Sequence, residues 1–180
     1  YDEFALEAAL RAKETEESST VTVMTLGNDE AQENLRNALA LGADEATLLK
    51  GDVTMDCLAT AKELAQEMKS KSPDLVLFGV KAGDDDQQQV GPMVATLLDY
   101  RCVTNVTNFE VQESIVTCKR QIEGGNEVVE VTLPAVITVT KGEFEPRIPS
   151  LKRNMASKKK TLVTKDVQVP DSQQLLTAME

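Results

Sequence analysis

The residues best suited to chemistry lie in a turn that starts at Gly79 and ends at Gly91. Three aspartates, residues 84–86, are followed by three glutamines, residues 87–89, and then by a helical pattern. The first backbone N–H groups of a helix lack partners inside it and carry the positive end of its dipole, so they favour phosphate. A carboxylate accepts hydrogen bonds from ribose hydroxyls. We interpret the turn as a nucleotide site, with an aspartate on the ribose and the amides of residues 88–90 on phosphate.

The three aspartates also fit a purely structural role. Acidic residues are common in the first turn of a helix, where they cap its free N–H groups and interact with its dipole. Spacing alone leaves both interpretations open.

A short apolar run, residues 75–78, leads into this turn and positions it. Such a run is typical of a strand buried on both faces of a parallel sheet. The helical pattern after the turn extends from about Gln88 to Leu98. In α/β folds, ligands bind outside the carboxyl ends of the strands, so the turn at residues 26–28, after another predicted strand, also qualifies.

The first hundred residues alternate between helical and strand patterns. Apolar spacing of three and four predicts helices at residues 2–17, 29–41 and 55–68, and shorter apolar runs predict strands at residues 21–26 and 46–49. Asp2 is expected to cap the first helix. Alternating elements of this kind predict a parallel sheet with helices on both faces.

The pattern becomes rich in β-formers after Tyr100. Strands are predicted at residues 102–111, 114–121, 127–133 and 135–140, with a hairpin turn at residues 123–126. The fold class is therefore a Rossmann-like three-layer α/β sandwich, whose mostly parallel sheet is extended by antiparallel strands. Residues 1–160 are expected to form one domain, and residues 161–180 a C-terminal extension that trails away as an arm.

Composition excludes several classes of function. The net charge of −11 argues against nucleic acid and anionic membrane surfaces, and no apolar run approaches the roughly 20 residues of a spanning helix. Three widely separated cysteines indicate a reducing compartment rather than a disulfide framework. The chain has no histidine, which removes the commonest general base and zinc ligand, so we expect neither a metal site nor most hydrolase mechanisms.

A loop bounded by Pro146 and Pro149 is followed by a short predicted helix at residues 151–157. Its first residue, Leu151, is surrounded by basic residues such as Arg147 and Arg153. One apolar anchor with a charged rim suggests a protein docking site. The alternative is an ordinary surface loop whose lysines keep an acidic protein soluble.

Taken together, these residues resemble the small (beta) subunit of electron-transfer flavoprotein along nearly the whole chain. Cys118 and Gln121 depart mildly from the family pattern, and the family's first strand and an Asn-Pro ahead of Tyr1 are absent. The motifs that carry the resemblance are residues 1–8, residues 38–44, the turn 79–91, Glu123-Gly-Gly with Glu127 and Pro134, and Glu145-Pro-Arg147 leading to Lys158–Lys160.

The resemblance implies an electron carrier subunit rather than an enzyme. In this family the beta subunit pairs with an alpha subunit that holds most of the FAD, and the beta subunit binds AMP. Bifurcating members bind a second FAD in its place. Electrons come from flavin dehydrogenases, such as the acyl-CoA dehydrogenases of fatty acid oxidation, and pass to a quinone reductase or another acceptor. The expected location is the bacterial cytoplasm or the mitochondrial matrix. A stand-alone adenine-nucleotide sensor of the same fold remains an alternative.

The resemblance also assigns roles to individual residues. Tyr1 aligns with an aromatic residue near the FAD, and Leu151 with the leucine that anchors the dehydrogenase. Asp85 is expected to contact the ribose or adenine. The turn departs from AMP-binding relatives, which commonly have Asn and then Gln-Thr where this chain has Gln88-Gln89-Val90. The expected AMP contacts are Leu26, Ala82, Asp85, Gln88, Gln89 and Val90.

Overall fold

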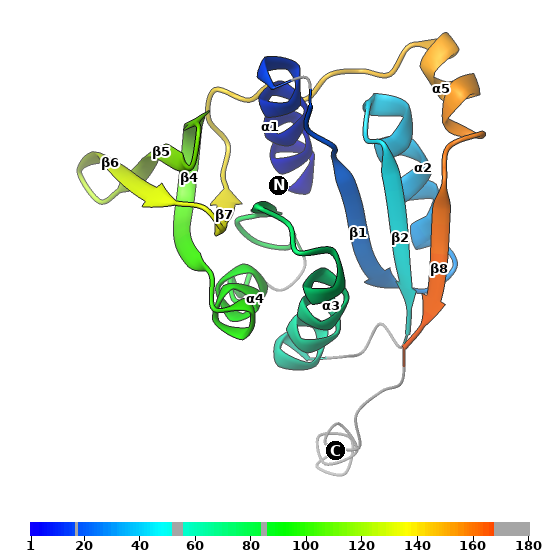
Figure 1. Ribbon diagram of the computed structural model, residues 1–180, viewed down its shortest axis with the longest axis horizontal. Coiled ribbons are helices and arrows are strands. Elements are labelled where there is room, and N and C mark those ends of the chain that lie inside the picture. The colour runs from blue at the N-terminus through cyan, green and yellow to red at the C-terminus, as the bar shows by residue number, and fades with distance from the viewer. Residues whose placement is uncertain (17, 52–55, 84–85, 168–180) are drawn as a thin grey trace.

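The computed structural model describes residues 1–16, 18–51, 56–83 and 86–167 (Figure 1). These residues form five helices and eight strands. The helices are α1 (Asp2–Thr15), α2 (Ala31–Leu41), α3 (Cys57–Lys71), α4 (Val90–Leu98) and α5 (Leu151–Ser157). The strands are β1 (Thr22–Gly27), β2 (Glu45–Lys50), β3 (Leu75–Gly79), β4 (Arg101–Gln112), β5 (Ile115–Ile122), β6 (Gly125–Thr132), β7 (Ala135–Val139) and β8 (Leu162–Asp166).

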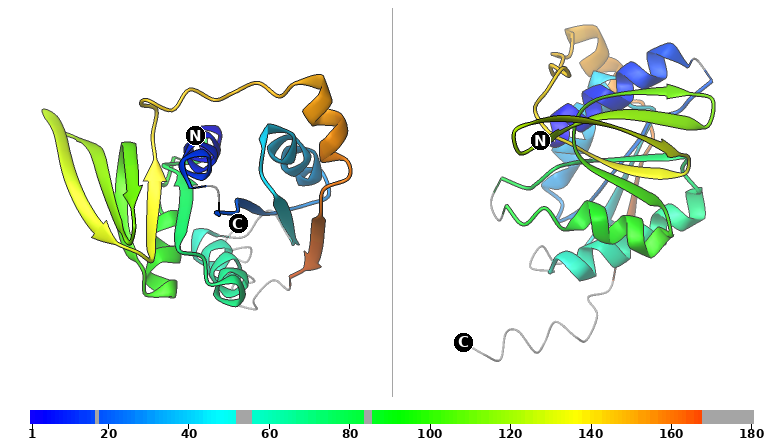
Figure 2. Two further views of the ribbon diagram at one scale, coloured as in Figure 1. Left: turned by 45° about the horizontal axis from the view of Figure 1, so that its top comes forward. Right: turned by 90° about the vertical axis from the view of Figure 1, so that its left-hand side faces the viewer.

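The strands form two sheets between two layers of helices. The first sheet has the order β1-β2-β8 and is parallel throughout. The second has the order β3-β7-β4-β5-β6, in which β7 pairs parallel with β3 and β4, and the last two pairings are antiparallel. Figure 2 shows α1 and α2 on one side of the sheets and α3 and α4 on the other. The predicted Rossmann-like three-layer fold is therefore confirmed.

Apolar packing explains why the predicted elements form. All five residues of β7 are buried, as a central strand covered on both faces requires. On one face, Ala5 and Ala8 of α1 pack with Val106 of β4 and Ile137 of β7. On the other face, Val94 of α4 lies in a cluster with residues of α3.

Local details differ from the sequence predictions in three places. Asp2 does not cap α1, because its carboxylate accepts a hydrogen bond of 2.8 Å from the amide of Gly79 at the end of β3. Residues 162–166 do not trail away; they form the parallel edge strand β8 beside β2. The single predicted sheet is divided in two, since no pairing between β1 and β3 occurs among the described residues. Residues 168–180 of the predicted arm lie outside the described residues.

Among the described residues, no helix has the length and apolar character needed to cross a membrane.

Candidate functional site

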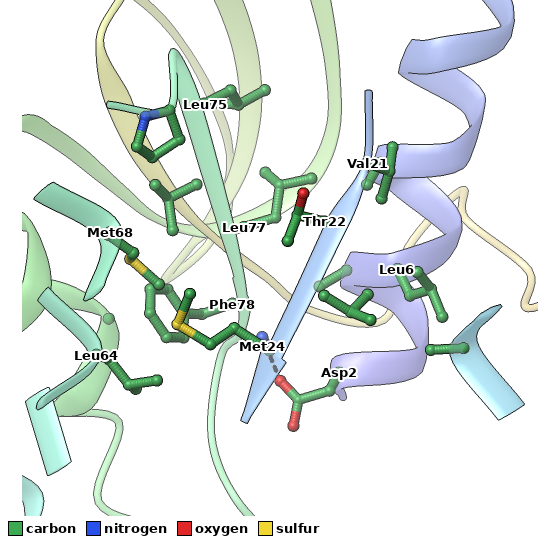
Figure 3. A pocket seen from close by; sticks show the side chains of 18 of the residues that line it. Asp2, Leu6, Val21, Thr22, Met24, Leu64, Met68, Leu75, Leu77 and Phe78 are labelled. Carbon is green, nitrogen blue, oxygen red and sulfur yellow. Dashed lines mark hydrogen bonds between the residues drawn. The ribbon is translucent and has the colours of Figure 1, made fainter. Parts of the chain in front are cut away.

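A cavity of about 1890 Å³ lies between the two sheets. Consecutive residues of β1 and β3 line it along their length, together with one side of α1 and part of α3 (Figure 3). The turn that leads into α4, residues 87–91, closes the end of the cavity at which both strands finish. The cavity therefore reaches the carboxyl edge of the strands, where ligands of α/β folds bind.

The inner part of this cavity is apolar, and we call it the slot. Leu6 of α1 lies on one side of it, whereas Leu64 and Met68 of α3 lie on the other. Met24 of β1 and Phe78 of β3 are partly buried and pack against the same cluster as Leu64 and Met68. The slot thus has apolar walls on both faces and the unpaired edges of β1 and β3 on its sides.

The outer part of the cavity is polar and is formed by the N-terminus of α4. Gln89 is the N-cap residue; its side chain makes no capping hydrogen bond, and its carbonyl accepts from the amide of Met93 at 3.0 Å. Gln88 has a φ of 57°, so the chain turns sharply before the helix begins. Because a helix leaves its first amides unpaired, the N–H groups of residues 89–90 have no partner inside α4.

Gly91 allows α4 to approach the sheet closely. A Cβ at this position would lie 2.7 Å from Cγ2 of Thr138 in β7 and 3.5 Å from a ring carbon of Phe78. The side chain of Thr138 is fixed by a hydrogen bond of 3.2 Å from the amide of Asn105 to its Oγ1. The position of the α4 amides therefore depends on the absence of a side chain at Gly91.

The N-terminus of α1 lies at the same edge. The bond between Asp2 and Gly79 holds it against the end of β3. The ring of Tyr1 lies 5.7 Å from Nζ of Lys81, and that nitrogen donates a 2.6 Å hydrogen bond to Asp86. The carboxylate of Asp86, the last of the three aspartates, therefore pairs with a lysine.

The structure brings most of the predicted nucleotide residues together. Leu26, Ala82, Gln88, Gln89 and Val90 all line the one cavity, as does Tyr1. Leu26 and Val90 are half-buried, whereas Ala82, Gln88 and Gln89 are exposed. Asp84 and Asp85, including the predicted ribose contact, lie outside the described residues.

Leu151 does not belong to this cavity. It is the first residue of α5, and 78% of it is exposed. Ile148 and Met155, which the sequence analysis did not single out, are also exposed, at 90% and 67%. We call residues 148–155 the docking segment. Met155 follows Leu151 by four residues, so the two lie on the same face of α5, and this helical spacing could have revealed the larger apolar surface.

The sequence analysis also missed a buried ion pair next to the docking segment. Glu7 of α1 is only 4% exposed, and its carboxylate accepts hydrogen bonds from Arg11 and Arg147. Burial alone would raise the pKa of Glu7, but these hydrogen bonds outweigh it and hold the pKa below its ordinary value. Hydrogen bonds to Glu7 and Glu14 raise the pKa of Arg147. A glutamate between apolar residues of a helix, four residues before an arginine, was the available signal.

The described residues offer little reactive chemistry. They contain no cluster of three histidine, cysteine, aspartate or glutamate side chains that could hold a metal ion. Burial raises the pKa of the Cys118 thiol to about 11.

Fold and cavity together define a Rossmann-like α/β domain with a cavity open at the carboxyl edge of its strands. Residues 1–170 match the family described as "Electron transfer flavoprotein domain". The chain belongs to this family.

Similar proteins include several beta subunits of electron transfer flavoprotein. The protein of Syntrophomonas wolfei is 40% identical over 164 residues, which cover 91% of this chain and 65% of that protein. The protein of Bacillus subtilis is 39% identical over 165 residues, covering 90% and 64%. A subunit of the caffeyl-CoA reductase–Etf complex of Acetobacterium woodii is 42% identical over 153 residues, covering 83% and 58%. The matches thus cover between 58% and 65% of the length of these relatives.

Proposed function

We propose that this chain acts as the beta subunit of a heterodimeric electron transfer flavoprotein. It pairs with an alpha subunit that holds the FAD, and it supplies a scaffold, a nucleotide site and a docking surface. Electrons enter from a flavin dehydrogenase, such as an acyl-CoA dehydrogenase, and leave to a quinone reductase or another acceptor. The family match over residues 1–170 supports this role.

One observation carries the nucleotide part of the proposal. Five residues expected to contact AMP, which come from β1, the turn after β3 and the start of α4, line a single cavity at the carboxyl edge. We assign the phosphate to the amides of Gln89 and Val90, and the ribose or adenine to Asp85. Unpaired amides at a helix N-terminus favour an anion, which supports the assignment. Tyr1, at the same edge, is assigned to the neighbourhood of the FAD.

We further propose that a strand of the family fold occupies the slot. The unpaired edges of β1 and β3 carry backbone donors and acceptors that need partners when they are buried. The walls of the slot are apolar on both faces, which suits a strand with a continuous apolar run. Its neighbours have six and five residues, so a strand of similar length fits.

A second candidate is a bifurcating member that binds a second FAD in place of AMP. Val90 supports this alternative, because it lacks the hydroxyl that AMP-binding relatives commonly carry in this turn. A relative named as part of the caffeyl-CoA reductase–Etf complex also shows that the family includes subunits of reductase complexes.

The test is to purify the chain together with its alpha subunit, extract the complex with acid and count nucleotides by chromatography. One FAD and one AMP per complex are expected, and the Asp85→Ala variant should lose the AMP but retain the FAD. Two FAD without AMP would favour the bifurcating alternative. A colourless chain that recruits no alpha subunit and responds to ATP would overturn the proposal in favour of a stand-alone sensor.

A further inference from the structure

Residues 140–150, which we call the strap, connect β7 of the second sheet to α5. Figures 1 and 2 show the strap passing over α1 to reach α5, which packs beside α2. The strap contains no helix or strand. Its path is therefore set by the contacts of its side chains and by isolated backbone hydrogen bonds.

The first half of the strap is attached to the second sheet. The amide of Glu143 donates to the carbonyl of Thr107 at 3.1 Å. The carboxylate of Glu143 accepts hydrogen bonds from Asn108 at 2.7 Å and from Lys119 at 3.1 Å. The next residue, Phe144, is 4% exposed and lies in the core cluster. These contacts fix the strap as far as Phe144.

The second half of the strap is attached to α1 by Arg147. Nε and Nη2 of Arg147 donate to the two carboxylate oxygens of Glu7, at 2.7 and 3.0 Å. The backbone amide of Arg147 donates to the same carboxylate at 3.3 Å, and Nη1 reaches Glu14 at 2.6 Å. A planar guanidinium held at both oxygens of a buried carboxylate is fixed in direction as well as in place.

Arg147 is the last attachment before the docking segment. Between Phe144 and Ser150, all of which the structure describes, no other residue makes a hydrogen bond to another element. The next fixed point is α5 itself, which Ser150 caps. Arg153 of α5 donates to the carbonyl of Leu41 in α2, and Arg36 of α2 donates to the carbonyls of Ser157 in α5 and of Lys160 just after it. Ile148 and Leu151 therefore lie between two attachments, and Arg147 directly precedes Ile148.

We propose that Arg147 and Glu7 are positioning residues for docking. Their bidentate ion pair fixes the start of the docking segment and thereby restricts the position of Leu151. This inference rests on the proposed docking role of Leu151. A segment that is already ordered loses less conformational entropy when it binds. Loosening the pair should therefore raise KM for the dehydrogenase and leave electron transfer within the bound complex unchanged.

The test uses the FAD-containing heterodimer and the acyl-CoA dehydrogenase that reduces the wild-type complex fastest. The variants are Arg147→Lys, which keeps the positive charge but cannot form the bidentate pair, and Glu7→Gln. Both variants are expected to raise KM for the dehydrogenase roughly 5- to 10-fold and to leave kcat and FAD content unchanged. The assay is run well below the unfolding temperature of the variants. Hydrogen exchange of residues 145–151 should become faster. The matched control Glu14→Gln affects a carboxylate that is 59% exposed, so KM should change less than about 2-fold.

A double variant separates positioning from general stability. If Arg147 acts through Leu151, adding Arg147→Lys to Leu151→Ala should change KM by less than about 2-fold. Equal effects of Arg147→Lys in both backgrounds would overturn the inference. An unchanged KM in Arg147→Lys, with a raised KM in Leu151→Ala, would also overturn it and leave the docking role intact. An unchanged KM in Leu151→Ala would instead remove the docking role itself. If Glu7→Gln fails to fold, the Arg147→Lys results decide alone.

Discussion

Gly91→Ala is expected to destabilise the chain although alanine is the better helix former. The new Cβ would lie 2.7 Å from Cγ2 of Thr138, a distance that requires one of the two atoms to move. Thr138 is 2% exposed, and its hydroxyl is held by the amide of Asn105. Rotating the methyl group away would therefore break a hydrogen bond in the core, and the remaining response is a shift of α4 away from β7.

The magnitude follows from two opposing effects. Overpacking a well-filled contact typically costs about 1–3 kcal/mol. Replacing glycine by alanine in a helix gains at most about 1 kcal/mol, and less in the first turn, where Gly91 lies. The expected net loss is about 1–2 kcal/mol. With an m-value of about 2 kcal/mol/M, the urea midpoint should fall by roughly 0.5–1 M.

Thr138→Ser provides the rescue, because it deletes only the methyl group and retains the hydroxyl. Alone it should cost about 1 kcal/mol for one lost buried methyl group. The double variant Gly91→Ala/Thr138→Ser should lose less free energy of unfolding than the two single variants added together, and the difference should be about 1–2 kcal/mol. Gly125→Ala is the control, since a Cβ added at Gly125 has no heavy atom within 4 Å beyond its chain neighbours. A Gly91→Ala variant as stable as the wild type, or strictly additive effects, would refute the close-contact argument.

Three further predictions concern other parts of the chain. Asp44 accepts hydrogen bonds from Lys13 and from the amide of Val21. Burial raises the pKa of Asp44, but these hydrogen bonds outweigh burial and hold the pKa below its ordinary value. The ionised carboxylate therefore stabilises the fold above about pH 4, and this stabilisation is lost as the pH falls through the lowered pKa of the folded state. The urea midpoint of Asp44→Asn should therefore vary less between pH 2.5 and 5 than that of the wild type. Cys118, with a pKa near 11 and no exposed surface, should resist thiol reagents at pH 8 in the folded chain and react after unfolding, as mass spectrometry of its peptide would show. Amides of β1 and β3 that face the slot should exchange slowly while a strand occupies it and quickly in a form without that strand, and equal hydrogen-exchange rates in the two forms would contradict the proposed strand.

The sequence predicted the order and type of the elements before residue 161, because each of them has a local cause. The run at residues 75–78 became β3, and the helical spacing after the turn became α4, beginning two residues later than expected. The hairpin turn between β5 and β6 also formed, with Gly124 at a φ of 81°. Alternation, helical period and turn residues act between neighbours in the chain, so they can be read without the tertiary structure.

Contacts between distant residues could not be predicted in this way. The carboxylate of Asp2 was free, on local grounds, to cap its own helix, but the fold brings the amide of Gly79 to it from 77 residues away. Residues 162–166 are too polar to indicate a buried strand, yet they need bury only one edge against β2. In both cases an element elsewhere in the fold decides between two locally acceptable outcomes.

Some features of the candidate site also depend on local sequence, and others depend on contacts between distant residues. The amides at the start of α4 follow from the local strand–turn–helix pattern, and this is why the phosphate position could be proposed from the sequence. Their distance from the sheet, however, is set by Gly91 against Thr138, and the docking segment is held by Arg147 against Glu7, 140 residues away. The candidate phosphate position could thus be predicted from local sequence, whereas its place relative to the sheet depends on pairs of residues that only the folded chain brings together.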